Sequence, residues 1–233
     1  GVNAGNSITS GGNYNVVVGD EAGTAITTSD YNVAVGYNAG TSVTTGKENT
    51  LIGSLAGDAL TDADFNIAIG WGALGADTLG SKSVAIGTGA LDAQNFTSAT
   101  DSFNVAVGHN AGSDVTTGVK NTLIGGLAGD ALTDADFNIA IGYVALSADT
   151  LGSRSTAIGH GALFAQNFTS ATDTYNTAVG NNAGAAVTTG VNNTLIGGLA
   201  GDALTEGGNN TALGMNALGA DTLGSRNTAI GYQ

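Results

Sequence analysis

Short apolar runs recur along the chain, each between a polar residue and a glycine. The run Asn32 to Gly36 is Asn-Val-Ala-Val-Gly, and thirteen copies of this five-residue motif occur at steps of 17 residues, except for two steps of 21. Runs of this length, rich in β-branched side chains and bounded by Asn and Gly, are typical of β-strands. The pattern predicts thirteen short strands, one in each turn of a repeat structure.

A longer repeat is superimposed on the first, because Gly36, Gly108 and Gly180 are 72 residues apart. Four turns form one unit, and one turn of each unit has four extra residues that we expect to form a bulge. Residues 1–233 are thus a single array with units at about 32–103, 104–175 and 176–233, the last incomplete, after the end of a preceding unit at 1–31. Both ends fall inside a repeat, so we expect a fragment of a longer fibre.

Each predicted strand is apolar on both faces, as in Val33, Ala34 and Val35. Side chains alternate along a strand, so both faces need cover. The column of Ala residues suits the narrow interior of a 17-residue turn, whereas the Val and Ile columns need a second surface. Long exposed apolar rows mark interfaces, and we expect three copies to assemble around an axis. The predicted fold is an all-β parallel β-solenoid.

The polar residue and the glycine of each motif have structural roles in this interpretation. Asn tolerates turn conformations and hydrogen-bonds to nearby backbone, and stacked Asn side chains form ladders. Gly permits a positive φ or close backbone approach where the chain turns. The residues assigned to these roles are Asn32, Gly36, Asn66, Gly70, Asn104, Gly108, Asn138 and Gly142.

Composition and charge exclude several partners. The chain has 39 Gly, no Pro and 42% hydrophobic residues, which indicates order rather than a flexible linker. Its formal net charge of −14 argues against nucleic acid and anionic membrane surfaces. No stretch approaches the roughly 18 apolar residues of a membrane span, so we expect no membrane insertion in this segment. There is no Cys to form disulfides or thiolate metal sites.

The motif resembles repeats of known fibrous proteins. Asn66 to Ala73, Asn-Ile-Ala-Ile-Gly-Trp-Gly-Ala, resembles the left-handed parallel β-roll of trimeric autotransporter adhesin heads. Where Thr-Thr-Gly precedes the motif, as in Thr188 to Thr194, the sequence is similar to repeats of bacteriophage tail-fibre proteins. The resemblance covers nearly the whole chain. It implies a left-handed roll in an intertwined or side-by-side homotrimer that is extracellular and non-enzymatic. The 17-residue turn is longer than is usual in adhesin heads and favours the tail fibre.

Two clusters of Asp residues are candidates for metal ligands or for the acids of a glycosidase. Their spacing matches neither an EF-hand loop nor the nonapeptide of calcium-binding β-rolls, and a solvated acidic edge is the preferred interpretation. We expect no catalytic residue and no cofactor, with Ca²⁺ the one candidate ion. The candidate ligands are Asp58, Asp62, Asp64, Asp130, Asp134 and Asp136.

The two His residues and the few basic residues do not indicate a metal site or a catalytic site. His109 and His160 stand alone in a column that accepts many residue types, which argues against metal binding. Three oppositely charged pairs could form weak ion pairs within or between chains. They are Asp77 with Lys82, Asp149 with Arg154, and Asp221 with Arg226.

Two features are candidates for recognition. Exposed aromatic residues are common at binding surfaces and sugar-contact sites, and the column after the motif glycine contains Tyr37, Trp71, Tyr143 and Tyr232. The other feature is the bulge with Phe96 and Phe168. Its identity in two copies also suits a packing role.

Four functions were compared. A phage tail-fibre shaft used in host attachment is preferred, and the alternative is the head of a bacterial trimeric surface adhesin. In both cases the partners of the chain would be two further copies of itself and a cell-surface glycan or protein receptor. The fibre would belong to a virion or to a bacterial surface. An ice-binding solenoid is disfavoured because Thr44-Thr45 has no counterpart at Asp62-Ala63 or Gly80-Ser81. A polysaccharide depolymerase is the weakest hypothesis.

Overall fold

The computed structural model describes residues 1–9 and 11–232. It divides into two compact units, Gly1–Val119 and Lys120–Gln233. The described residues form strands and turns without any helix, so none of them builds an apolar helix that could cross a membrane. Each of the thirteen motif copies contributes one strand. The chain is an all-β parallel solenoid, as the pattern predicted.

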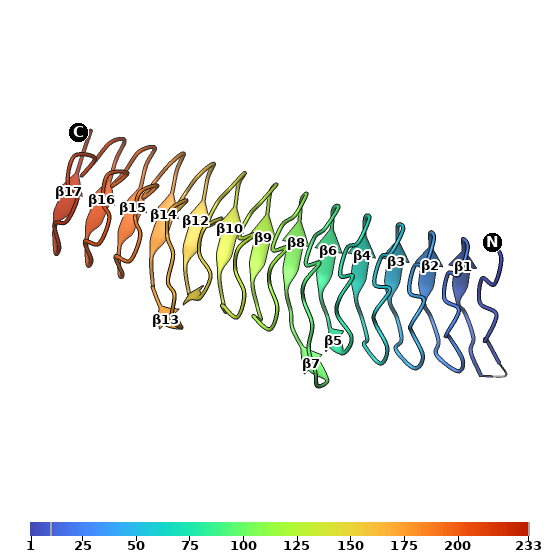
Figure 1. The fold of residues 1–233 in the computed structure, drawn as a ribbon. Coiled ribbons are helices and arrows are strands. Elements are labelled where there is room, and N and C mark those ends of the chain that lie inside the picture. The colour runs from blue at the N-terminus through green and yellow to red at the C-terminus, as the bar shows by residue number, and fades with distance from the viewer. Residues whose placement is uncertain (10, 233) are drawn as a thin grey trace. The chain divides into compact units, whose positions relative to one another are not determined.

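In the first unit, six motif strands pair in parallel, each with the strand of the next turn (Figure 1). They are β1 (Val16–Val18), β2 (Val33–Val35), β3 (Thr50–Ile52), β4 (Ile67–Ile69), β6 (Val84–Ile86) and β8 (Val105–Val107).

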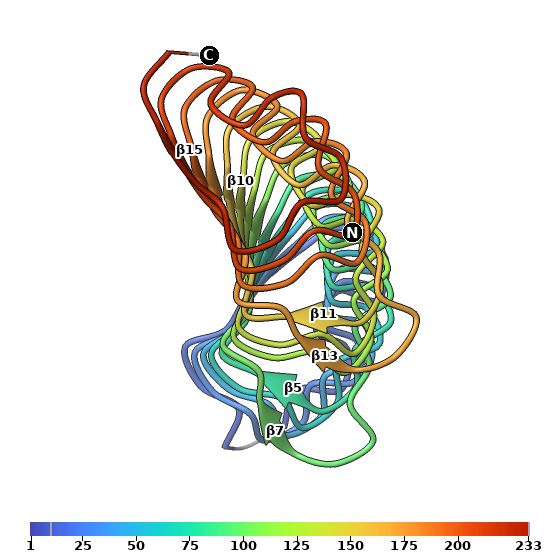
Figure 2. The same cartoon turned by 90° about the vertical axis from the view of Figure 1, so that its left-hand side faces the viewer.

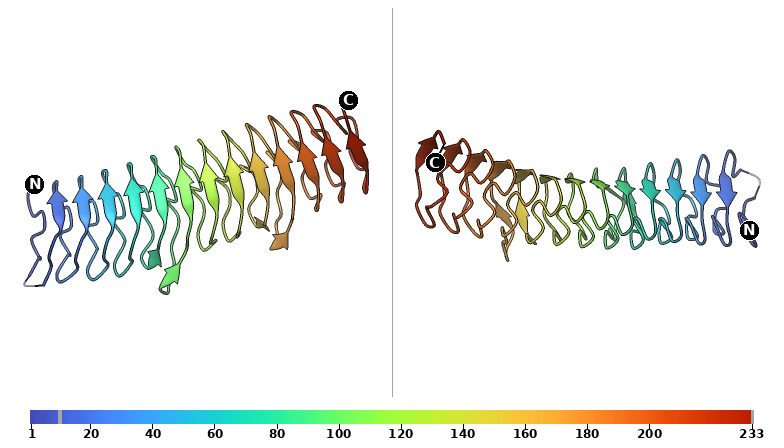
Figure 3. Two further views of the ribbon diagram at one scale, coloured as in Figure 1. Left: turned by 180° about the vertical axis from the view of Figure 1, so that it is seen from behind. Right: turned by 90° about the horizontal axis from the view of Figure 1, so that it is seen from above.

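The second unit repeats this arrangement with seven motif strands. They are β9 (Thr122–Ile124), β10 (Ile139–Ile141), β12 (Thr156–Ile158), β14 (Thr177–Val179), β15 (Thr194–Ile196), β16 (Thr211–Leu213) and β17 (Thr228–Ile230). Figure 3 shows the same strands from behind and from above.

The strands stay in register through both turn lengths. Val33 pairs with Thr50 across a 17-residue step, and Val84 pairs with Val105 across a 21-residue step. The four extra residues therefore leave the ladder as a bulge. Short strand pairs close its base, β5 (Gly80–Ser81) with β7 (Thr100–Asp101) and β11 (Gly152–Ser153) with β13 (Thr172–Asp173), away from the motif strands (Figure 2). The predicted bulge is confirmed.

The strand alternation separates small from bulky apolar residues. Ala34 and Ala68 are buried in the interior, at 1% and 0% exposure. Ile67, the neighbour of Ala68, remains 37% exposed on the outer side. The assignment of the Ala column to the interior, and of the Val and Ile columns to the outside, is confirmed.

The buried Asn residues connect one turn to the next through the backbone. Asn66 Nδ2 donates to Gly80 O at 2.9 Å, and Asn66 Oδ1 accepts from Ser83 N at 2.9 Å. Asn138 makes the same two bonds to Gly152 and Ser155. The ladder is thus formed mainly by amide groups that bond to backbone, and these bonds satisfy polar groups that burial would otherwise leave unpaired.

Ser replaces Asn only in the motif copies that precede a bulge, and a glutamine takes over its role. Gln94 Nε2 donates to Ser83 Oγ at 2.9 Å, and Gln94 Oε1 accepts from Asn104 Nδ2 at 2.8 Å. The longer Gln side chain crosses the wider turn that a short Ser cannot cross. Gln166 and Ser155 repeat the arrangement.

The expected pairing of Asp77 with Lys82 is wrong. Asp77 is fully buried and accepts hydrogen bonds from Gln94 Nε2 at 2.6 Å, Gly80 N at 3.0 Å and Phe96 N at 3.2 Å. Lys82 instead pairs with Asp101 of the bulge at 2.5 Å. A carboxylate inside the turn satisfies backbone donors that an exposed ion pair would leave unpaired.

Within one chain, the other two expected pairs are also wrong. Arg154 pairs with Asp173 at 2.9 Å. Asp149 accepts from Gly152 N and Phe168 N, each at 3.0 Å. Asp221 accepts from Gly224 N at 2.7 Å and Asn227 Nδ2 at 2.9 Å.

Burial raises the pKa of the Asp77 carboxyl above its ordinary value, although hydrogen bonds from Gln94, Phe96 and Gly80 act in the opposite direction. The folded chain therefore holds this proton to a higher pH than the unfolded chain does. The stability from this group is present at low pH and is lost as pH rises through the raised pKa. On acidification from neutral pH, the wild type should gain unfolding free energy relative to Asp77→Asn. Denaturant titrations of both proteins across this range test this, and parallel pH profiles would contradict it.

The side chains of the bulge phenylalanines are buried in the single chain. Phe96 and Phe168 are only 5% and 7% exposed. Their backbone N–H groups donate to the buried carboxylates of Asp77 and Asp149, so the bulge folds back onto its own turn. This burial favours the packing role over recognition by these two side chains.

The expectation that Thr44 and Thr45 lack counterparts in the following turns is wrong for Thr44 and correct for Thr45. Thr44 Oγ1 donates to Thr61 O, and Thr61 Oγ1 donates to Thr78 O, so Thr44 does have counterparts in the next two turns. The row of Thr45 is interrupted as expected, because Thr45 donates to Asp62. The hydroxyls of the continuous row donate to carbonyls of the following turn rather than to solvent alone.

Candidate functional site

The outward side of the motif strands is the largest candidate surface. In the first unit, both outward positions of most strands carry Val or Ile, as in Ile67 and Ile69 of β4. In the second unit, Thr occupies the first outward position of every motif strand except β10, which has Ile139. Ile139 and Leu213 are 38% and 45% exposed. We call this surface, formed by the first and third residues of each motif strand, the outer strand face.

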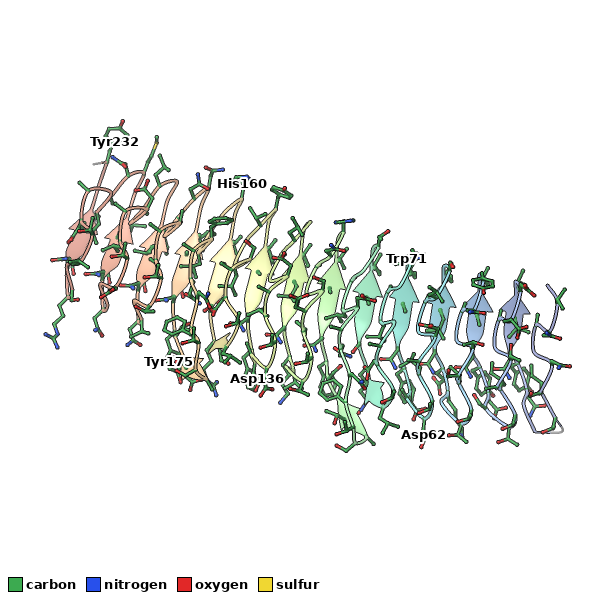
Figure 4. All side chains as sticks on the ribbon, viewed as in Figure 1. Asp62, Trp71, Asp136, His160, Tyr175 and Tyr232 are labelled. Carbon is green, nitrogen blue, oxygen red and sulfur yellow. The ribbon has the colours of Figure 1, made fainter. Side chains whose placement is uncertain are left out.

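The column after the motif glycine lies at one edge of this face. Trp71 lies at the end of β4, and His160 and Tyr232 hold the equivalent place in the second unit (Figure 4). Tyr37, Trp71, Tyr143 and Tyr232 are 54%, 57%, 55% and 74% exposed. His160 was expected to stand alone, but it stacks on Tyr143 with ring centroids 5.8 Å apart.

A second aromatic column, directly before the motif Asn, was not recognised in the sequence. In the first unit it begins with Tyr14 and Tyr31, which stack with centroids 5.0 Å apart, and it ends with Phe103 beneath the Lys82 ammonium at 5.3 Å. In the second unit, Arg154 lies 4.8 Å from the Phe137 ring and 5.9 Å from the Tyr175 ring. The signal was available as aromatic and basic residues at 17-residue spacing.

This second column lies on the opposite side of the strands from the first, as Tyr175 does in Figure 4. Its aromatic residues are about half exposed, with Phe65 and Phe103 both at 48%. The outer strand face is thus bordered on both sides by aromatic side chains, a composition that is enriched at protein interfaces.

The acidic candidates do not gather in one place. Asp58 lines a hollow beside Trp71, whereas Asp62 lies at the opposite side of the turn (Figure 4). Asp62 accepts from Thr45 Oγ1 at 2.6 Å, and Asp64 accepts from Lys47 N at 2.7 Å. In the second unit, Asp136 N donates to Ser153 Oγ at 2.9 Å. Within the described part of the chain, no three His, Cys, Asp or Glu side chains converge as a metal site would require.

Comparison with known proteins identifies no relative of the chain. No family model, curated protein or solved structure matches the chain. The outer strand face and the two aromatic columns beside it are therefore the features that indicate a function.

Proposed function

We propose that the chain is a non-enzymatic shaft segment of a homotrimeric extracellular fibre, of the bacteriophage tail-fibre kind, that serves in host attachment. In this proposal the coil is left-handed, and three copies pack lengthwise through their outer strand faces. A rigid rod of this kind works by reach and by presenting several copies of one surface to a receptor.

The observation that carries the proposal is the outer strand face itself. Ala fills most of the interior, so the bulkier Val and Ile side chains remain partly exposed to water in a single chain. Burial of apolar area stabilises association by about 25 cal/mol per Å² before the costs of binding. A row that recurs at every turn supports contact along the length of the fibre rather than at one point.

An Ile69→Glu variant tests this packing. Ile69 points outward from β4, so a single chain leaves the new carboxylate hydrated, whereas a trimer gathers three of them in an apolar contact. We expect self-association to weaken about 100-fold, measured by sedimentation velocity over a range of concentrations. The matched control is Thr97→Glu, which puts the same charge on the exposed bulge. Equal self-association of the two variants would contradict the proposal.

A bacterial trimeric adhesin head is the second candidate, and the motif Asn66 to Ala73 resembles such heads. The two candidates make the same prediction for Ile69. The full-length gene product distinguishes them, since a membrane-anchoring barrel after this segment would support the adhesin and a virion-attachment region would support the tail fibre.

A further inference from the structure

A hollow of about 330 Å³ lies in the first unit, at the edge of the turn that begins with β4. Its lining comes from three successive turns and includes two glycines. The residues that define it are Leu55, Asp58, Trp71, Gly72, Gly75 and Asp92.

The side chains of Asp58 and Asp92 both approach Gly75. A methyl group placed on Gly75 would lie 3.0 Å from Asp92 Oδ1 and 3.6 Å from Asp58 Oδ1. The Gly72 carbonyl oxygen lies 3.2 Å from the same point, so three oxygen atoms surround the place of the missing side chain. A cationic group with several N–H donors, bound at this point, would lie close to both oxygens and could form charge-assisted hydrogen bonds, which span about 2.7–2.9 Å between heavy atoms.

The two carboxylates lack a cation of their own. Burial raises the pKa of Asp58, with a further contribution from the charge of Asp92, and burial also raises the pKa of Asp92. Lys82 and Arg154 pair with Asp101 and Asp173 rather than with these two carboxylates. A neutral ligand would leave this like-charge repulsion in place, whereas a cation would offset it.

Trp71 supplies the remaining wall. Its side chain is 57% exposed and lines the same hollow. The face of an indole ring is the best aromatic partner for ammonium and guanidinium groups. An apolar stem next to the charged group would also lie against Leu55 and the ring.

We propose that this hollow binds an organic cation, an ammonium or guanidinium group on an apolar stem, between Asp58 and Asp92 and against Trp71. The inference rests on the proposed attachment function only for the source of the cation, which would be a basic side chain or an amino sugar of the receptor. The hollow then gives the edge of the fibre a definite ligand chemistry.

The second 72-residue copy provides an internal control. It keeps Asp130 at the place of Asp58 but has Ser147 in place of Gly75 and Phe164 in place of Asp92. The gap is filled there and one carboxylate is replaced by an aromatic ring. We therefore expect one cation-binding site of this kind per chain.

The test uses the fluorescence of Trp71, which is the only Trp in the sequence. The whole chain is titrated with N-acetyl-arginine methylamide and, separately, with glucosamine. The neutral controls are citrulline methylamide and N-acetylglucosamine. We expect saturable change with one or both cations and none with their neutral counterparts at equal concentration. The two cations distinguish a protein source from a sugar source, and equal binding of cations and neutral controls would overturn the proposal.

Two variants taken from the second copy show whether the signal arises in this hollow. Gly75→Ser and Asp92→Phe introduce side chains that the equivalent turn already accommodates, so we expect both to fold with an unchanged circular dichroism spectrum. Each should weaken cation binding about tenfold, measured by isothermal titration calorimetry as well as by fluorescence. Unchanged affinity in both variants would overturn the proposal.

The same samples separate this inference from the proposed function. A trimer that binds neither cation would overturn the cation site and leave the fibre intact as a proposal. A monomer that binds a cation with the expected variant effects would support the site and contradict the trimeric fibre.

Discussion

A Gly70→Ala variant is expected to lose the pairing between β4 and β6 and at least about 4 kcal/mol of unfolding free energy. Gly70 has a φ of 138°, which side chains rarely allow. A methyl group there would lie 2.5 Å from Gly87 O and 2.6 Å from Gly87 C. These atoms belong to the backbone of the next turn and cannot rotate away as a flexible side chain would, so the turns must separate.

The measurement is hydrogen exchange by mass spectrometry across β3 to β6, together with denaturant unfolding followed by circular dichroism. The matched control is Gly231→Ala, which has a similar φ of 126° but no neighbouring atom within 4 Å of the added methyl group. It should show only the conformational cost, about 1–3 kcal/mol. Equal losses in the two variants would show that contact with the next turn is not what requires glycine.

An Asp77→Ala variant is expected to release the bulge and to cost about 3 kcal/mol or more. Removal of the carboxylate leaves the N–H groups of Gly80 and Phe96 and the amide of Gln94 without their acceptor in a buried place. Phe96 should then become exposed, because its backbone bond to Asp77 holds it against the turn.

Limited proteolysis and hydrogen exchange of residues 95–101 measure this release. Asp149→Ala repeats the experiment in the second unit, where Asp149 accepts from Gly152, Gln166 and Phe168. Thr97→Ala, on the exposed part of the bulge, is the control and should behave as the wild type does. Bulges that stay protected in both Asp variants would contradict the role given to these carboxylates.

The strands and their register could be predicted because each turn repeats the same constraints. Gly70 recurs in every turn, and Asn66 recurs in all turns except the two that have Ser83 and Ser155, so one motif determines the local structure of nearly all of them. The longer turns have four extra residues, and the strands on either side stay in register, as the pairing of Val84 with Val105 shows. The extra residues must therefore protrude from the ladder.

The buried bonds of the bulge could not be predicted in the same way. Asp77 and Gln94 are 17 residues apart and meet only because their turns stack, whereas Asp77 and Lys82 are close in sequence and point to different sides. Sequence proximity favoured the wrong pair. The geometry of a solenoid makes residues one turn apart the nearer neighbours.

The same reasoning explains what the site prediction missed. The acidic residues were grouped along the chain as Asp58, Asp62 and Asp64, but Asp58 lies with Gly75 and Asp92, at successive steps of 17 residues. The column before the motif Asn was missed because its members differ in type. They also adopt a positive φ, 60° at Phe65 and 63° at Lys82, which residue preferences would not predict.

The mass of the unmodified chain in solution is the most direct test of lengthwise packing through the outer strand face. Sedimentation equilibrium over a wide range of concentrations should give three times the chain mass of 22.6 kDa. A single species of 22.6 kDa at every concentration, with the Val and Ile columns stable in water, would contradict it.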